Sequence, residues 1–177
     1  MSTPVETALL LTVPAADPVV GRHRSRLDRA ARVGVPAHVT IVYPFVPFGS
    51  LRTTDLATLT GLARSVEAFT LAFERVGWFG EQVVHLEPTP AAPVLDLIAA
   101  VGEAFPDFPP YGGAHDEHVP HLTVGHDRPV EELRVAEAAV TRELPLTQRV
   151  DALALWAGPP LLTEEPGWRQ VGVFPLA

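Results

Sequence analysis

The sequence predicts an α+β fold in a single domain. Segments with the alternation of β-strands and segments with the periodicity of α-helices interleave in both halves of the chain, and one pair of strands forms a hairpin. This order fits α+β better than a doubly wound parallel sheet. The length of 177 residues suits one domain, or two small lobes sharing a core, and an apolar fraction of 47% is ample for that core.

We expect residues 1–177 to form one domain whose halves are linked near residues 88–93, a proline-rich segment. In the first half, Asp17 should cap the first helix with Pro18 as its first residue, and Gly34 should end it. Thr53 or Thr54 should cap the second helix. The expected segments are a strand over 6–13, a helix over 17–34, a strand over 38–45, a second helix from 53 or 54, and a hairpin of strands 69–76 and 83–87 with its turn at 77–82.

The second half repeats the alternation of helices and strands. It begins with a helix that carries an apolar face and continues into the longest irregular segment of the chain. The expected segments are a helix over 94–105, a loop over 106–120, a strand over 121–126, a helix over 129–143, and strands over 146–156 and 168–174.

Two copies of one short pattern dominate the sequence, and each closely follows a proline. The pattern is histidine, apolar residue, threonine, apolar residue, and it begins at His38 and again at His121. Both copies lie in apolar runs that predict strands, in which side chains two positions apart share a face. His38 and Thr40 should therefore lie together, as should His121 and Thr123, each pair roughly 6.5 to 7 Å apart along the strand.

This pair of pairs suits in-line attack on a phosphodiester. One imidazole can take a proton from the nucleophile while the other gives a proton to the leaving oxygen. The two threonine hydroxyls can donate to the non-bridging oxygens, where negative charge develops. One copy alone would be weak support, because a histidine in a strand is more often a buried core residue. Two copies in matching contexts favour a functional pair.

The doubled pattern resembles the 2H phosphoesterase superfamily, which includes the 2′-5′ RNA ligase-like proteins and the RNA 2′,3′-cyclic phosphodiesterases. The resemblance extends over nearly the whole chain. It implies a bilobal fold of two pseudo-symmetric antiparallel-sheet lobes, with helices outside and a central cleft across which the two motifs face each other. One position departs: the cyclic phosphodiesterases often carry an arginine five residues after the second motif histidine, where this chain has His126.

By this resemblance we expect a phosphodiesterase that acts on 2′,3′-cyclic phosphates or 2′-5′ bonds of nucleotides or RNA ends, with ligation as the reverse reaction. His121 is the expected base and His38 the expected acid, and no metal or other cofactor is required. The alternative is a nucleotide-binding or RNA-end-binding protein with little turnover, which the acidic composition and His126 favour.

The charge balance limits the partners. The net charge is −8 and every basic residue is an arginine, so the chain is poorly suited to long duplex nucleic acid. The first residues do not resemble a secretory signal, and the apolar run over 9–13 is too short to span a membrane. Without cysteine there are no disulfides, which fits a cytoplasmic protein. We expect a monomer acting on a small nucleotide or RNA end.

Two further groups of residues have more than one interpretation. The arginines of the first helix form either a solvated face or, for one or two of them, a contact with a substrate phosphate. In the loop 106–120, either Phe108 or Tyr111 could stack on a base or anchor the loop, and His118 should lie at the rim of the cleft. The arginines are Arg22, Arg24, Arg26, Arg29 and Arg32.

A metal site is the competing interpretation of the histidines. His115, His118, His121 and His126 form a dense cluster with two neighbouring acidic residues, and such clusters can bind zinc. This interpretation leaves His38 and Thr40 without a role, so we favour the two-histidine site.

Overall fold

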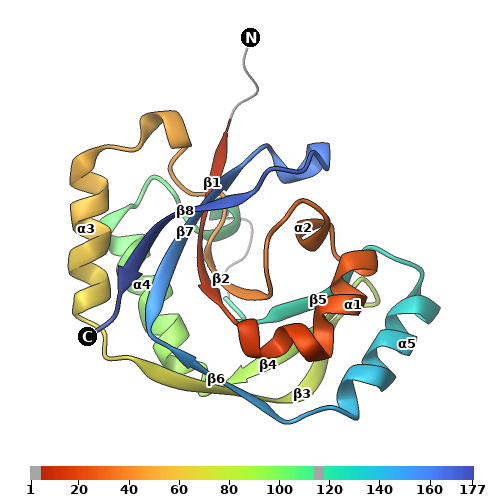
Figure 1. Ribbon diagram of the computed structural model, residues 1–177. Helices are drawn as coiled ribbons and strands as arrows, with labels where there is room; N and C mark the ends of the chain where they lie inside the picture. Colours follow the sequence, from red (N-terminus) through yellow and green to blue (C-terminus); the bar gives the residue numbers. More distant parts are fainter. Residues whose placement is uncertain (1–4, 114–117) are drawn as a thin grey trace.

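The computed structural model describes residues 5–113 and 118–177, apart from the side chain of Tyr111. Its described part contains two four-stranded antiparallel sheets (Figure 1). Along the first sheet the strand order is β2-β1-β7-β8, and along the second it is β5-β4-β3-β6. The predicted α+β fold with two antiparallel sheets is therefore confirmed.

Each sheet combines strands from distant parts of the chain. The first sheet consists of β1 (Glu6–Thr12), β2 (His38–Val42), β7 (Ala152–Gly158) and β8 (Arg169–Pro175). The second sheet consists of β3 (Phe69–Phe79), β4 (Val83–Thr89), β5 (Leu122–His126) and β6 (Leu146–Val150).

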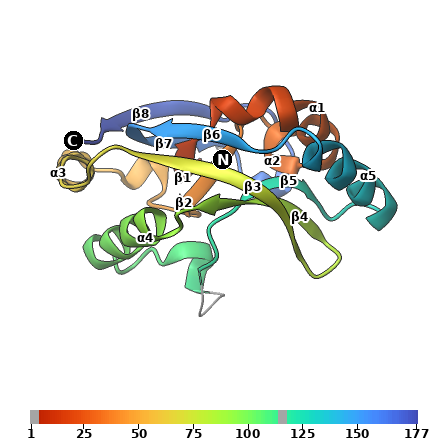
Figure 2. The same ribbon diagram turned by 90° about the horizontal axis from the view of Figure 1, so that it is seen from below.

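The helices flank the sheets in two groups. In Figure 1, α3 and α4 lie on one side of the molecule and α1, α2 and α5 lie on the other, and Figure 2 shows the same separation from below. The helices are α1 (Asp17–Leu27), α2 (Arg29–Arg32), α3 (Thr53–Arg64), α4 (Ala92–Ala104) and α5 (Val130–Thr141). Four short 3-10 helices cover Pro14–Ala16, Phe48–Ser50, Pro110–Gly113 and Leu161–Thr163.

The two sheets share one hydrophobic core. Leu9 and Ile41 from the first sheet and Leu71 and Leu122 from the second belong to a single cluster of buried side chains. A smaller cluster lies on the opposite face of the first sheet, where Leu10 packs with Trp168 and their neighbours. Strand alternation produces this division, because successive side chains point to opposite faces.

Two strand predictions and one turn prediction are corrected by the pairing. The predicted strand 146–156 is two strands, β6 and β7, which belong to different sheets on either side of the exposed Asp151. The first strand of the hairpin continues through Phe79, because Gly77 and Phe79 pair with His85 and Val83. The turn is therefore shorter than the predicted 77–82.

The proline-rich segment 88–93 does not join the two sheets. It contains the end of β4 and the start of α4, and the next strand, β5, pairs directly with β4. The chain instead passes between the sheets after β2, through α3, and again at Asp151. Antiparallel pairing of distant strands is decided by tertiary packing, which local sequence does not specify.

The predicted first helix is interrupted at Asp28. Its backbone is extended there, and its carboxylate accepts a hydrogen bond from the N–H of Ala30 at 3.0 Å, which makes Asp28 the cap of α2. Asp17 is the first residue of α1 and does not cap it, because Ala16 of the preceding 3-10 turn holds the capping position.

The cap of α3 also differs from the prediction. Arg52 occupies the capping position, and the Asp55 carboxylate in the first turn accepts its backbone N–H at 2.8 Å. An acidic side chain in the first turn thus takes the role predicted for Thr53 or Thr54.

Within the described residues, no helix has the length and apolar character needed to cross a lipid bilayer.

Candidate active site

The two motif strands are edge strands of different sheets. β2 lies at one edge of the first sheet, β5 lies at one edge of the second, and the two strands contact each other. Because each motif occupies the edge that faces the other sheet, the two histidine–threonine pairs meet where the sheets meet. The pattern that the sequence repeats at a separation of 83 positions is thus brought into one place.

His38 and Thr40 lie on the face of the first sheet that is turned away from the main core. Thr40 pairs with Leu10 of β1, which belongs to the smaller cluster, whereas Val39 and Ile41 are buried in the main core. The predicted alternation is therefore confirmed for this strand. A pocket opens beside the two polar side chains and is lined by Ala30, Val35, Tyr43, Leu161 and Trp168.

The two motif histidines are held in the same way. Nδ1 of His38 lies 2.7 Å from the carbonyl oxygen of Pro36, and Nδ1 of His121 lies 2.8 Å from that of Val119. A carbonyl oxygen can only accept a hydrogen bond, so Nδ1 carries the proton in both rings. The neutral form of each ring then has its lone pair on Nε2, which can take a proton from a substrate group.

Aromatic rings surround His121. The edge of Phe79 meets it with the ring centroids 4.9 Å apart, and His85 lies at 5.4 Å. Phe79 and His85 stack on each other at 4.1 Å. His85 pairs with Thr123 across β4 and β5, which places it beside the second motif on the same face of the sheet. These contacts restrict the orientation of the His121 ring.

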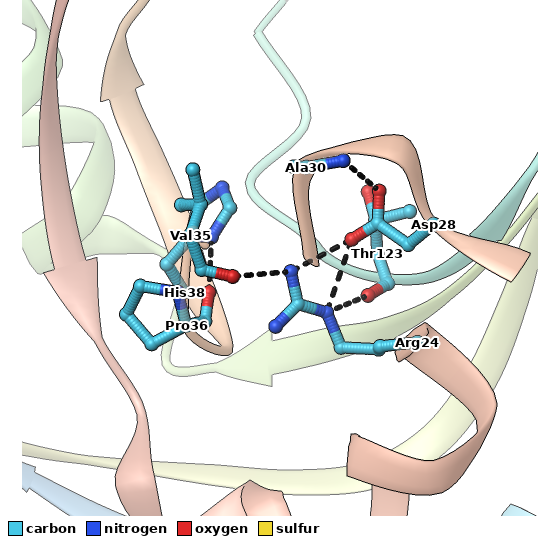
Figure 3. A network of polar contacts seen from close by, with 7 residues as sticks. All are labelled: Arg24, Asp28, Ala30, Val35, Pro36, His38 and Thr123. Atoms are coloured by element: carbon cyan, nitrogen blue, oxygen red, sulfur yellow. Dashed lines mark hydrogen bonds and ion pairs between the residues drawn. The ribbon is translucent and has the colours of Figure 1, made fainter. Parts of the chain in front are cut away.

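A buried arginine connects the two motifs. Arg24 of α1 donates from Nε to the carbonyl oxygen of Thr123 at 3.1 Å and from an Nη to the carbonyl oxygen of Val35 at 3.4 Å (Figure 3). The same guanidinium forms an ion pair with Asp28 at 2.7 Å, and both side chains are at most 5% exposed. One side chain therefore contacts the second motif and the segment that leads into the first.

The arginines of the first helical segment could have formed a solvated face. For Arg24 this interpretation is wrong, because its side chain is buried. Arg26 is largely exposed, whereas Arg24 is 3% exposed. Asp28 compensates the buried charge, and burial of an unpaired guanidinium would be far more costly.

The site keeps its histidines neutral. Burial, with the Arg24 guanidinium as the next cause, lowers the pKa of His38 to about 4. Burial also lowers the pKa of His121 below its ordinary value of 6.5, and it lowers the pKa of His85 to about 4. Without substrate, all three rings are therefore uncharged at neutral pH.

The three predicted substrate-binding residues of the loop 106–120 differ in what the structure shows of them. Phe108 packs edge-on against the buried Phe45 at 6.0 Å and lines a surface groove with Arg52 and Asp55, so it anchors the loop on the core. The side chain of Tyr111 lies outside the described residues. His118 is half-buried and lies three positions before His121, and its place at the rim of the cleft stays a prediction.

Four residues of the site have positions that the sequence did not predict. Arg24 and Asp28 belong to the first helical segment, and Phe79 and His85 belong to the hairpin. A signal for the first pair was present, since an arginine and an aspartate four positions apart on a helix can pair. Nothing in the local sequence indicated that β4 would lie beside β5 and bring His85 to His121.

The zinc interpretation falls partly outside the described residues. His115 and its acidic neighbours Asp116 and Glu117 are not described. Among residues 5–113 and 118–177, no three histidine, aspartate or glutamate side chains are grouped as metal ligands. A chelator assay therefore decides between the two interpretations.

Comparison with known proteins identifies relatives of this site and fold. A family model described as the 2′-5′ RNA ligase superfamily matches residues 12–158, which include both motifs. No curated protein matches the chain significantly.

Solved structures share the fold at low sequence identity. E. coli LigT, in its complex with NADP+, is 19% identical over 99% of both chains with a TM-score of 0.61, and its complex with 3′-AMP gives 0.57. The protein TT0787 of Thermus thermophilus is 18% identical over 97% of both chains, also with a TM-score of 0.57.

Proposed function

Because this chain belongs to the 2′-5′ RNA ligase superfamily, we propose that it is a phosphodiesterase with a two-histidine mechanism. Its substrates are 2′,3′-cyclic phosphates or 2′-5′ phosphodiester bonds of nucleotides or RNA ends. The observation that carries this proposal is the pair of motif strands at adjoining sheet edges, with both imidazoles bonded through Nδ1 to a carbonyl two residues earlier. E. coli LigT has been crystallised with 3′-AMP and with NADP+, which supports a nucleotide as the ligand.

The reaction with a cyclic phosphate uses both imidazoles. Nε2 of one ring takes a proton from water as the water oxygen bonds to phosphorus. The bond from phosphorus to the ribose 3′-oxygen breaks, the other ring gives that oxygen a proton, and the phosphate stays on the 2′-oxygen. The hydroxyls of Thr40 and Thr123 donate to the non-bridging oxygens, on which negative charge develops. A 5′-hydroxyl in place of the water forms a 2′-5′ bond by the same proton transfers, and this ligation is the reverse of cleaving that bond by attack of the 3′-hydroxyl.

The electrostatics of the two histidines and the charge of the bound substrate bear on which ring is the base and which is the acid. We expected His121 as base and His38 as acid, yet burial and Arg24 keep His38 neutral down to about pH 4, which suits a base. An anionic phosphate placed between the rings favours their charged forms and raises both pKa values. The acid therefore acquires its proton in the complex and not in the free enzyme.

The experiment is a turnover assay in excess chelator with 2′,3′-cyclic nucleotides, 2′-5′ dinucleotides and RNA ends that carry a cyclic phosphate. His38→Ala and His121→Ala should each lower kcat by at least about 100-fold, the usual effect of a positioned acid or base. Thr40→Ala and Thr123→Ala should each cost roughly 3 kcal/mol or less of transition-state stabilisation. His23→Ala on α1 is the matched control and should retain activity.

The pH profiles of the single variants assign the roles. The base variant should lose the acidic limb of the profile, and the acid variant should lose the alkaline limb. Loss of activity in chelator that zinc restores would contradict the mechanism and favour the metal site. Tight binding without turnover would favour the alternative, a nucleotide-binding or RNA-end-binding protein.

A further inference from the structure

A second polar pocket lies at the far end of β5 from the motif threonine. We call it the arginine pocket, because three arginines contribute to its lining. It is small, with a volume of about 60 Å³, which suits a single compact group and not a whole nucleotide. Its lining residues are Arg29, Arg32, His126, Asp127, Arg128 and Glu164.

The arginine pocket adjoins the pocket beside the first motif. His126 follows Thr123 by three positions on the same strand, a distance of roughly 10 Å along β5. Ala30 of α2 lines the pocket that holds His38 and Thr40, and its neighbour Arg29 lines the arginine pocket. The segment after β7 contributes in the same way, with Leu161 in the first pocket and Glu164 in the second.

Charge in the arginine pocket is arranged for an anion. A single carboxylate oxygen of Glu164 lies 3.3 Å from Nε of Arg29 and 3.0 Å from an Nη of Arg32, so one anionic atom already occupies the position between two guanidiniums. The side chains of these three residues are between 32% and 44% exposed, and ion pairs at such exposure are weak. An incoming dianion can therefore compete with Glu164.

The third arginine keeps an unused donor. Nε of Arg128 is buried and has no hydrogen-bond partner within the described residues. The other carboxylate of the pocket, Asp127, lies 3.1 Å from Nε2 of His126. Arginine matches the geometry of phosphate oxygens with two parallel donors, which makes phosphate the best fit for this set of side chains.

We propose that the arginine pocket binds a second phosphate of the substrate, one that is not cleaved. This inference rests on the proposed function, because it assumes that the scissile phosphate lies between His38 and His121. The second phosphate is the one on the 5′-oxygen of the nucleotide that carries the cyclic phosphate, either as a free 5′-monoester or as the diester that links this nucleotide to an RNA chain. The arginines of α2 thus supply local positive charge in a protein of net charge −8.

The test compares matched substrates with and without the second phosphate. The substrates are a 2′,3′-cyclic nucleotide, the same nucleotide with a 5′-phosphate, and a dinucleotide that ends in a cyclic phosphate. The wild-type protein should have a higher kcat/KM for the last two. In Arg32→Gln and Arg128→Gln, the ratio of kcat/KM with and without the second phosphate should fall roughly tenfold or more, the effect of losing a charged hydrogen bond.

Arg26→Gln is the matched control, because Arg26 belongs to the same arginine run but pairs with Glu132 and lines a different groove. It should keep the wild-type ratio. Glu164→Gln should raise the ratio, since it removes the carboxylate that competes with phosphate. Comparison of the 5′-phosphorylated nucleotide with the dinucleotide shows whether the pocket prefers a phosphate monoester or the diester at that position.

A ratio that stays unchanged in Arg32→Gln and Arg128→Gln would overturn the inference while leaving the proposed function intact. If no substrate is turned over, titration with the 5′-phosphorylated nucleotide separates the two proposals. Binding that weakens in Arg128→Gln and not in Arg26→Gln would support the arginine pocket although the proposed function had failed. Binding that is equal in both variants would reject the pocket as well.

Discussion

At the scale of single residues, Arg24 is the side chain on which the geometry of the site depends. Its guanidinium donates to backbone carbonyls of Thr123 and Val35, and Asp28 neutralises it. All of its hydrogen bonds go to groups of the protein. We therefore regard Arg24 as a positioning residue, which holds the two motifs at a fixed separation and keeps a positive charge near His38.

Removal of Arg24 should change both turnover and titration. Arg24→Met leaves Asp28 buried and unpaired, so we expect a loss of about 3 to 5 kcal/mol in the free energy of unfolding. Misalignment of the motifs should lower kcat by up to about 100-fold. The pKa of His38 should rise, because Arg24 lowers it and Asp28 raises it. NMR titration of the His38 ring measures this shift directly.

Two further variants separate charge from geometry. Arg24→Lys keeps the charge but loses the fork of donors, so kcat should fall while the pKa of His38 stays near its wild-type value. The double variant Arg24→Met, Asp28→Asn should recover stability but not turnover. A pKa of His38 that is unchanged in Arg24→Met would contradict the electrostatic role. Among the groups that act on His38, the Pro36 carbonyl and His121 remain in every variant.

At the scale of secondary-structure elements, the motif strands were the most predictable part of the fold. His38 to Ile41 and His121 to Val124 carry their own alternation of polar and apolar side chains, and the structure buries the apolar ones in the core. The features that the sequence did not predict depend on packing between elements that are distant in the chain. The local pattern of polar and apolar residues does not show that 146–156 is divided between two sheets. Nor does it show that Arg24 bonds to the backbone of β5.

The packing of α1 and α5 on β5 can be tested at Gly125. A Cβ at this position would lie 2.6 Å from Leu133 Cδ2 of α5 and 3.0 Å from Leu27 Cβ of α1. Gly125→Ala should therefore push the two helices away from the strand and destabilise the protein by about 1 to 3 kcal/mol, as overpacking does. Since α1 also carries Arg24, turnover should fall together with stability. Urea denaturation and the turnover assay provide the two measurements.

Gly61 provides the control for this substitution. It lies in α3, and no atom lies within 4 Å of a Cβ built there. Gly61→Ala should stabilise the protein by about 0.5 to 1 kcal/mol, because alanine loses less conformational entropy in a helix. Gly125→Ala with wild-type stability would show that α1 and α5 are not packed against β5 as closely as described.

At the scale of the whole molecule, the two sheets enclose several histidines that the folded protein holds neutral. Burial lowers the pKa of His38 and His85 to about 4 and that of His121 below 6.5. In the unfolded chain the same rings titrate near 6.5. Between about pH 4 and 6.5, the unfolded state therefore binds more protons than the folded state.

The free energy of unfolding should accordingly rise with pH through that window. Stability depends on pH in proportion to the difference in bound protons, and a ring whose pKa falls from 6.5 to about 4 contributes up to about 3 kcal/mol. The contribution is fully present above pH 6.5 and is lost as the pH falls toward 4.

The variant His85→Leu should reduce the slope of this pH dependence by up to one proton, since a leucine side chain binds no proton in either state. Urea denaturation of the wild-type protein and His85→Leu at intervals between pH 4 and 8 measures both slopes. Equal slopes in the wild-type protein and His85→Leu would mean that His85 is not held neutral. A free energy of unfolding that does not change with pH in the wild-type protein would contradict a site that starts its reaction with uncharged imidazoles.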